Sequence, residues 1–339
     1  MYTIERRYGV FSMTVGFCAW LACGAALAAD VRVGIIGLDT SHAVAFSQAL
    51  NAENPAQEYA GFRVTAAYPK GSPDIVSSIS RVPEYIEKVT ALGVQIVDSI
   101  GELLEQTDVI LLESNDGRPH LEQALPVFKA GKRVFIDKPV AGSLADAVLI
   151  FDAAKRHGVP VFSASSLRYT VKAQEIRAGK HGPVIGASAF SPCKLEPTHP
   201  DFFWYGIHGV EQLYTLMGTG CVSVVRVSTP GTDVAVGTWA GGRVGVFRGN
   251  RDSNAGYGAE AFVQKGVQDV DDYKGYDRLL AEIVAFFKSG VAPVAPEETL
   301  EIFAFMEAAD ESKRLGGVPV KLADVLAKAH AEAARRTME

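Results

Sequence analysis

The chain has 339 residues, of which 48% are hydrophobic and 21% are charged, and its formal net charge is −6. This length suits two globular domains, because a single hydrophobic core stops growing near roughly 250–300 residues. The acidic balance, with no basic block beyond one arginine pair, argues against nucleic-acid binding, which requires a positively charged surface.

Residues 1–29 have the pattern of a secretory signal peptide. Arg6 and Arg7 precede an uncharged, mostly apolar run from Val10 to Ala29, and Ala26-Leu27-Ala28 forms a small-residue cleavage site. The arginine pair resembles a twin-arginine export signal, and a general secretory route is the alternative. An uncleaved membrane anchor is a further alternative, since the run is nearly long enough to span a bilayer. We expect a periplasmic or secreted protein with no stable membrane span after cleavage.

The first strand predicted after this segment is Val31–Gly37, an apolar run rich in β-branched residues. A short loop joins it to a helical pattern, as in the first unit of a dinucleotide-binding fold. The usual G-x-G-x-x-G fingerprint keeps only its first glycine, Gly37, because Asp39 and His42 occupy the other two positions. The pattern therefore predicts the fold clearly, but it does not predict how a phosphate would be held.

Strands and helices then alternate as far as residue 162. This spacing predicts a doubly wound parallel sheet, a Rossmann dinucleotide-binding domain over residues 30–165, with ligands beyond the carboxyl ends of its strands. The further predicted strands are 62–68, 94–97, 108–113, 133–136 and 161–162, and the predicted helices are 73–92, 100–104, 121–129 and 144–157. Lys70 and Ser72 follow the second strand and either accept the 2′-phosphate of NADP or form a solvated turn.

After residue 165 the alternation stops, which predicts an α+β domain with a mostly antiparallel sheet over 166–339. Its predicted strands are 222–228, 233–240, 243–249 and 259–264, and its predicted helices are 276–288, 296–315 and 323–336. Residues 256–261 match G-x-G-x-x-A, but they follow a polar stretch and lead into a strand pattern, so we attribute the match to chance. Cys193 and Cys221 are expected to be buried thiols, with a disulfide as the alternative.

The segment AGKRVFIDKP, residues 130–139, resembles the AGKHVxxEKP segment of the Gfo/Idh/MocA oxidoreductases, with Asp137 in place of their glutamate. The likeness continues in order along nearly all of the chain after residue 29. It includes Gly34–Leu38, His120, Leu167-Arg168-Tyr169, Gly206-Ile207-His208, Glu307-Ala308-Ala309 and Ser312. The resemblance implies a Rossmann domain followed by an open-faced sheet domain, and pairing through that sheet in a homo-oligomer.

The resemblance also implies an NAD(P)-dependent oxidoreductase that transfers hydride from a sugar or polyol hydroxyl. Lys138 would orient the substrate near the nicotinamide, and His208 would take the hydroxyl proton as the hydride leaves. Arg168 and Tyr205 are further candidates for contact with the small-molecule substrate. The expected contacts to NAD or NADP are Gly37, Leu38, Asp39, Thr40, Ser41, His42, Glu113, Asn115 and Lys138, and Arg118 is a further source of positive charge.

The acid/base position departs from the family pattern. Many members have an aspartate four residues before the histidine, where this chain has Trp204. Glu211, one helical turn after His208, is therefore expected to orient the imidazole. A metal site at His208-x-x-Glu211 would lack a third ligand, so no metal is expected.

The loop at Asp39 is the larger departure, because a carboxylate there would repel a pyrophosphate. In one hypothesis, Thr40, Ser41 and the helix N-terminus hold the phosphate, while Asp39 points away or caps the helix. In the other, dinucleotide binding is lost and the protein is a non-catalytic sugar-binding or scaffold protein. A third alternative is a glycoside-cleaving enzyme that uses bound NAD transiently.

Overall fold

The structure is a computed structural model and describes residues 1–5, 9 and 30–338. The arginine pair and the cleavage site of the predicted signal peptide lie outside the described residues. Within the described part of the chain, no helix combines the length and the apolar character that a membrane crossing requires.

The first sheet has six parallel strands in the order β3-β2-β1-β4-β5-β6, as predicted for a doubly wound fold. The strands are β1 (Val31–Ile36), β2 (Phe62–Tyr68), β3 (Gln95–Ile96), β4 (Val109–Leu112), β5 (Val134–Ile136) and β6 (Val161–Phe162). Their apolar side chains are buried between helices on both faces, which is why they appear as nearly continuous apolar runs. The strand order reverses between β1 and β4, the place where such sheets bind ligands.

Helices cover both faces of this sheet. One face packs against α1 (Ser41–Leu50) and α2 (Val76–Ala91), and the other against α3 (Ile100–Gln106), α4 (His120–Lys129) and α5 (Leu144–His157). The α5 boundaries follow from its sequence, because Ser143 accepts a hydrogen bond from the Asp146 amide at 3.1 Å and Gly158 ends the helix in the left-handed conformation.

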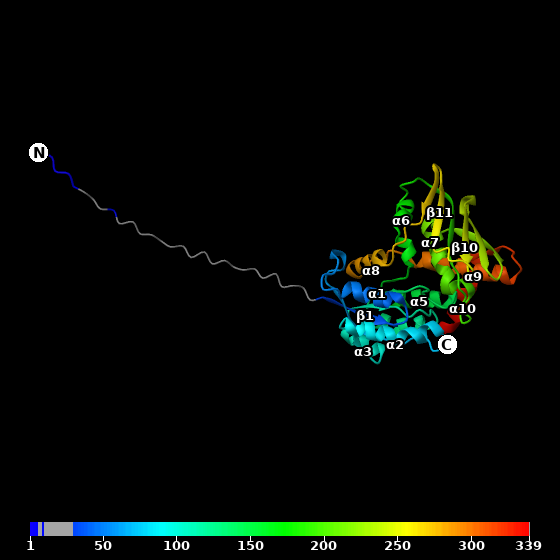
Figure 1. Cartoon of the computed structure of the whole chain (residues 1–339), viewed down its shortest axis with the longest axis horizontal. Helices are drawn as coiled ribbons and strands as arrows, with labels where there is room; N and C mark the ends of the chain where they lie inside the picture. Colours follow the sequence, from blue (N-terminus) through cyan, green and yellow to red (C-terminus); the bar gives the residue numbers. More distant parts are fainter. Residues whose placement is uncertain (6–8, 10–29, 339) are drawn as a thin grey trace.

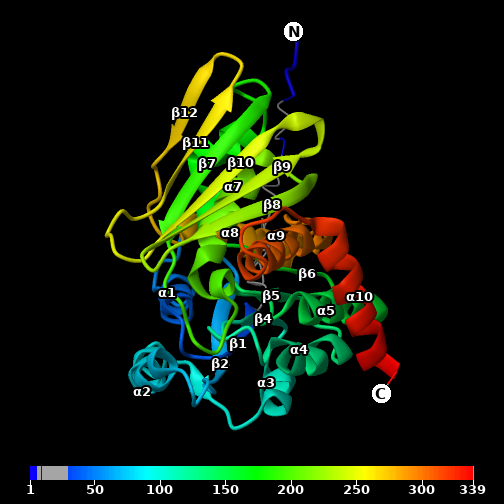
Figure 2. The ribbon, with the colours of Figure 1, turned by 90° about the vertical axis from the view of Figure 1, so that its right-hand side faces the viewer.

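The second sheet has seven strands in the order β12-β11-β7-β10-β9-β8-β13, and only its β7–β10 pair is parallel. The strands are β7 (Val184–Pro192), β8 (Cys221–Ser228), β9 (Thr232–Trp239), β10 (Val244–Asn250), β11 (Gly258–Val263), β12 (Gly266–Val270) and β13 (Val320–Lys321). Buried and more exposed residues alternate along β9 and β10, so one face is packed and the other is open. The packed face carries α7 (Ile207–Met217) and α9 (Pro296–Arg314) (Figure 2).

The chain returns to the first domain near its end, which the predicted division at residue 165 did not anticipate. Helix α8 (Asp277–Ser289) shares a core with α1, and the two lie side by side although they are far apart in sequence (Figure 1). Helix α10 (Leu322–Met338) packs along α5 (Figure 2). Residue 165 lies between β6, the last strand of the first sheet, and β7, the first strand of the second.

Several smaller predictions are also settled. Residues 258–263 form strand β11, so the G-x-G-x-x-A match is not a nucleotide loop. Cys193 and Cys221 are both free and buried. Strands β7 and β12 and helices α6 (Val171–Arg177) and α7 were not among the predicted elements.

Candidate active site

The loop after β1 requires glycine at its first position. The φ angle of Gly37 is +90°, and a Cβ there would lie 2.5 Å from the backbone nitrogen of Ser114. No other residue type combines that backbone conformation with so close an approach. The glycine thus brings the loops after β1 and β4 together at the reversal point of the sheet.

Asp39 points away from the N-terminus of α1. Its carboxylate accepts hydrogen bonds from the Ser78 hydroxyl at 2.6 Å and from the Asn115 amide at 2.9 Å. The side chain is fully buried, and burial raises the pKa of Asp39. The cap position of α1 belongs to Thr40, whose side chain makes no capping hydrogen bond. Asp39 therefore neither caps the helix nor presents its charge where a phosphate would meet the helix N-terminus.

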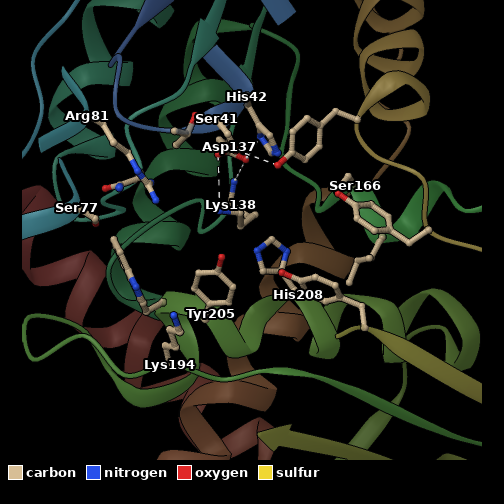
Figure 3. Close-up of a pocket in the computed structure, with 17 residues that line it drawn as sticks. Ser41, His42, Ser77, Arg81, Asp137, Lys138, Ser166, Lys194, Tyr205 and His208 are labelled. Carbon is tan, nitrogen blue, oxygen red and sulfur yellow. Dashed lines mark hydrogen bonds and ion pairs between the residues drawn. The ribbon is translucent and has the colours of Figure 1, made fainter. Parts of the chain in front are cut away.

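A polar cavity of about 270 Å³ lies at this edge of the sheet, between the two domains (Figure 3). Five of the predicted cofactor contacts line it, together with two predicted residues of the second domain: Thr40, Ser41, His42, Asn115 and Lys138, then Tyr205 and His208. Gly37, Leu38, Asp39 and Glu113 lie behind the cavity wall and are buried. These four residues were predicted as cofactor contacts, and in the structure they support the loops that form the wall.

Lys138 reaches the cavity from the end of β5. Its Nζ lies 3.9 Å from Oδ2 of Asp137, the residue that replaces the family glutamate. The Lys138–Pro139 peptide bond is cis. In Figure 3 the side chain points into the space that His208 and Tyr205 face from the opposite wall.

His208 stands in the first turn of α7, after a π-helical turn over Phe202–Gly206. Helix and sheet approach closely here, because a Cβ on Gly209 would lie 2.4 Å from the ring of Phe247. Nδ1 of His208 lies 2.9 Å from the Ser165 hydroxyl, which follows β6. Burial lowers the pKa of His208 well below its ordinary value, and the charge of Lys138 lowers it further. The imidazole is therefore neutral at neutral pH.

The structure corrects one prediction about the residues around His208. Glu211 does not orient the imidazole, because its Oε1 accepts a hydrogen bond from Arg168 Nε at 2.6 Å. Arg168, predicted as a substrate contact, in turn donates to Glu298 at 2.8 Å, is buried, and does not line the cavity. Ser165 takes the place expected of Glu211.

At the cavity wall, His42 from the start of α1 and Asp137 from the end of β5 converge with Glu113, which follows β4 and lies behind them. His42 Nδ1 lies 3.1 Å from Asp137 Oδ1 and 3.7 Å from Glu113 Oε2. Burial raises the pKa of Glu113 well above its ordinary value, and the charge of Asp137 raises it further. Burial alone would raise the pKa of Asp137 as well, but His42 and Lys138 outweigh burial and lower it.

A second cavity, of about 660 Å³, opens at the carboxyl ends of β2 and β4. Lys70 and Ser72 line it, although Ser72 donates its hydroxyl to Asp116 at 2.5 Å. Arg118, the predicted source of charge for a phosphate, is instead paired with Asp74 at 2.8 Å and with Asp116 at 2.7 Å.

The residues present fit a dinucleotide. The N-terminus of α1, which has no side-chain cap, opens onto the polar cavity, and a helix N-terminus is favourable for phosphate. Arg81 adds a cation at the same wall and is held there by a hydrogen bond to the Asp39 carbonyl at 3.1 Å. Buried Asn115 Oδ1, on a residue of the cavity wall, has no hydrogen-bond partner, as expected for a group that accepts from a ligand.

Many residues that line the polar cavity were not predicted from the sequence. Its unpredicted members are Ser77, Arg81, Asp137, Ser166, Leu167, Lys194, Trp204, Tyr257, Tyr273 and Tyr276. Tyr257 belongs to the loop before β11 that was dismissed as a nucleotide motif. The tyrosines come from loops whose positions depend on the second sheet, so no local pattern could place them.

Comparison with known proteins agrees with the geometry. Residues 31–165 match the Gfo/Idh/MocA oxidoreductase family with its NAD-binding Rossmann fold. The uncharacterized oxidoreductase YhhX of Escherichia coli K12 is 27% identical over 139 residues, which are 37% of this chain and 40% of that protein. The matched stretch thus spans less than half of that relative.

Solved structures resemble the chain over most of its length. The scyllo-inositol dehydrogenase of Lactobacillus casei, solved with NAD(H) and scyllo-inositol, has a TM-score of 0.71 and 16% identity, covering 87% of this chain and 99% of that one. The myo-inositol 2-dehydrogenase of Lactobacillus plantarum has a TM-score of 0.69 and 15% identity, covering 86% and 99%. At such identities the likeness establishes the two-domain fold.

Proposed function

Because the chain belongs to the Gfo/Idh/MocA oxidoreductase family through its NAD-binding Rossmann domain, we propose that it oxidises a hydroxyl group of a sugar or polyol. The observation that carries the proposal is the convergence of Lys138 and His208 on one polar cavity from two domains. The inositol dehydrogenases among the structurally similar proteins support a polyol as the substrate class.

In this proposal His208 is the base. An alcohol releases hydride readily only if its hydroxyl proton is removed as well, so the site needs a neutral acceptor near the carbon that is oxidised. Burial and Lys138 lower the pKa of His208 and keep it in the accepting form. Since Ser165 engages Nδ1, Nε2 is the nitrogen left for the substrate hydroxyl.

Lys138 holds the substrate oxygen while the proton leaves. Its ammonium stabilises the negative charge that develops on the oxygen, and Asp137 at 3.9 Å helps to fix its position. The rings of Tyr205 and Tyr257 lie 5.4 and 5.8 Å from the His208 ring. Their hydroxyls and apolar faces suit the hydroxyls and C–H groups of a polyol.

NAD or NADP, when bound, supplies the hydride acceptor. Thr40, Ser41, Asn115 and Arg81 would hold it at the N-terminus of α1. We further propose that the protein is exported, on the basis of the sequence of residues 1–29. Free dinucleotide is scarce outside the cytoplasm, so an exported enzyme of this kind would have to hold its cofactor tightly.

The proposal is tested with His208→Asn. Purified protein is supplied with NAD⁺ or NADP⁺ and with a panel that includes scyllo- and myo-inositol, and the absorbance of the reduced nicotinamide is followed. We expect turnover with at least one polyol and a loss in kcat of roughly 10²- to 10⁴-fold in the variant, the usual contribution of a general base. The matched control is His157→Asn, at the exposed end of α5, which should leave kcat unchanged.

Equal kcat in the His208 variant and the wild type would overturn the assignment of the base. Release of sugar from a glycoside without any net change in cofactor redox state would instead select the glycoside-cleaving alternative. Both outcomes are read in the same samples, since the products can be separated by chromatography after the absorbance has been recorded.

A further inference from the structure

Three side chains that take no direct part in the proposed proton and hydride transfer meet at the wall of the polar cavity. We propose that His42, Glu113 and Asp137, the carboxylate–histidine trio, bind a divalent transition-metal ion. The inference goes beyond the proposed oxidation and does not depend on it.

The fold brings the trio together by construction. Each residue comes directly from the carboxyl end of a neighbouring strand or the helix after it, β1–α1, β4 and β5, and these three strands are adjacent in the sheet. One ligand atom from each residue lies within 4.8 Å of the other two. Glu113 and Asp137 directly follow buried strands and His42 lies in the first turn of α1, so the convergence is fixed by the ends of regular elements.

The separations match those between ligands of a single ion. Two ligand atoms at about 2.1 Å from a metal lie roughly 3.0–3.4 Å apart at octahedral or tetrahedral angles. His42 Nδ1 is 3.1 Å from Asp137 Oδ1, which lies within that range, and 3.7 Å from Glu113 Oε2, which lies slightly above it. Small shifts of the Glu113 side chain would bring all three within bonding distance of one ion.

The trio also leaves hydrogen-bonding capacity unused. His42 Nδ1, Glu113 Oε1 and Asp137 Oδ2 are buried atoms without a hydrogen-bond partner. Glu113 and Asp137 are fully buried, and His42 is 4% exposed. Buried polar groups are normally satisfied, because leaving one unsatisfied costs about 1–3 kcal/mol. One such atom on each of three adjoining side chains is consistent with a missing partner that accepts electron pairs from nitrogen and oxygen together.

Other charged or polar groups around the trio do not fill that role. Lys138 approaches Asp137 at 3.9 Å, and Thr40 donates to Glu113 Oε2 at 3.4 Å. The Tyr276 ring contacts the face of His42 edge-on at 4.3 Å, and its hydroxyl is engaged with Ser41. These groups orient the three ligands, as supporting contacts do in metal sites, but none supplies a ligand-like bond to all three.

The site has access to substrate. His42 and Asp137 line the polar cavity, as Figure 3 shows, whereas Glu113 lies behind them (Figure 3). An ion held by three protein ligands keeps at least one coordination position open, the arrangement of catalytic rather than structural metal sites. One imidazole with two carboxylates suits Zn²⁺ or Mn²⁺ better than Mg²⁺ or Ca²⁺, which prefer oxygen ligands alone.

The test uses the full mature chain without a histidine tag, stripped with EDTA and then desalted. Zn²⁺ and Mn²⁺ are titrated separately by calorimetry, and the bound metal is counted by elemental mass spectrometry. We expect one tight site per chain, and weakening of its affinity by more than the roughly 10- to 100-fold that loss of a supporting group costs, in both Glu113→Gln and His42→Asn. His208→Asn, in the same cavity but outside the trio, is the matched control and should retain the metal.

Cobalt gives a readout that does not depend on the variants folding. Co²⁺ in the wild type is expected to show the intense visible absorption of a four- or five-coordinate site. The proposal is overturned if neither Zn²⁺ nor Mn²⁺ binds stoichiometrically and Co²⁺ keeps its spectrum in water, or if Glu113→Gln and His42→Asn bind as the wild type does. Dinucleotide binding and turnover are measured separately, so failure of this inference leaves the proposed oxidation standing, and the reverse also holds.

Discussion

Two buried clusters in this molecule have a similar arrangement of charges but differ in how these charges are paired and in whether they border the polar cavity. In each, a basic side chain stands between two carboxylates: Arg168 between Glu211 and Glu298, and His42 between Glu113 and Asp137. The arginine cluster is away from the polar cavity, and its ion pairs are 2.6 and 2.8 Å long. The histidine trio borders the cavity, and each of its members has an unpartnered buried atom, whereas in the arginine cluster Nη2 of Arg168 alone is such an atom.

The difference distinguishes charges that are buried to hold segments of the protein together from charges that are buried at a ligand site. Arg168 joins the segment after β6 to α7 and, through Glu298, to α9, and Arg177 binds the same glutamate at 2.6 Å. Both carboxylates are paired with arginines within the protein, so the cluster holds the segment after β6 against α7 and α9. The trio keeps bonding capacity in reserve at the edge of a cavity, and burial together with Asp137 raises the pKa of Glu113. Buried polar atoms without a partner, together with a shifted pKa, are typical of a site that binds a ligand.

The largest effect on stability is expected from Arg168→Met. Removing the shared cation leaves Glu211 buried without an ionic partner and Glu298 with Arg177 alone, which should reduce the free energy of unfolding by about 3–5 kcal/mol. Urea unfolding followed by circular dichroism measures the change. Turnover per folded molecule should stay close to that of the wild type, because Arg168 does not reach the cavity. A stable variant with a greatly raised KM would restore the prediction that Arg168 contacts the substrate.

A smaller effect on the free energy of unfolding should distinguish the two clusters when the isosteric changes Glu298→Gln and Glu113→Gln are compared. Burial would raise the pKa of Glu298, but Arg168 and Arg177 outweigh burial and lower it, so this group is ionised. Its neutralisation should cost about 3 kcal/mol. Burial and the charge of Asp137 raise the pKa of Glu113 and so favour its neutral form, and its replacement should therefore cost less than about 1 kcal/mol. Equal losses in urea unfolding would contradict the distinction.

The smallest effect is a difference in pH dependence. The folded-state pKa of Glu113 lies above its unfolded value, so the folded protein binds the extra proton, and the stability from this group falls as pH rises from its unfolded pKa through its folded pKa. The range from pH 5 to pH 7 lies about one to three units above that unfolded value. Across it, the free energy of unfolding of the wild type should fall by up to about 1.4 kcal/mol per pH unit relative to that of Glu113→Gln. Metal-free samples unfolded in urea across this range provide the comparison. Parallel profiles would mean that Glu113 is ionised throughout.

Much of the fold could be predicted because it rests on local patterns. Strand β2 and helix α5 have the boundaries that their sequence patterns predicted, 62–68 and 144–157. Strand β7 was missed because its sequence, VIGASAFSP, is rich in small residues and lacks a clear alternation. Its conformation depends on pairing with β10 and β11, which no local pattern reveals.

The site was predicted in part, for a similar reason. The ends of β4 and β5 and the start of α7 place Asn115, Lys138 and His208, and the motifs at those ends are visible in the sequence. Helical spacing suggested Glu211 as the partner of His208, but Arg168 arrives from another segment and binds it more strongly than a neutral imidazole could. Such contacts are decided by competition between side chains that are far apart in sequence, and a single sequence does not show which side chains compete.

The central claim is that the loop after β1 binds a dinucleotide although Asp39 and His42 replace two of its glycines. Its most direct test is the nucleotide content of the protein purified from its native compartment without added cofactor. The protein is denatured, and the supernatant is assayed by mass spectrometry. Our account predicts about one NAD(H) or NADP(H) per chain, held at the N-terminus of α1 while Asp39 stays turned toward Ser78. If no dinucleotide is released, and none binds when the folded protein is titrated, the loop does not bind this cofactor and the proposed oxidation is wrong.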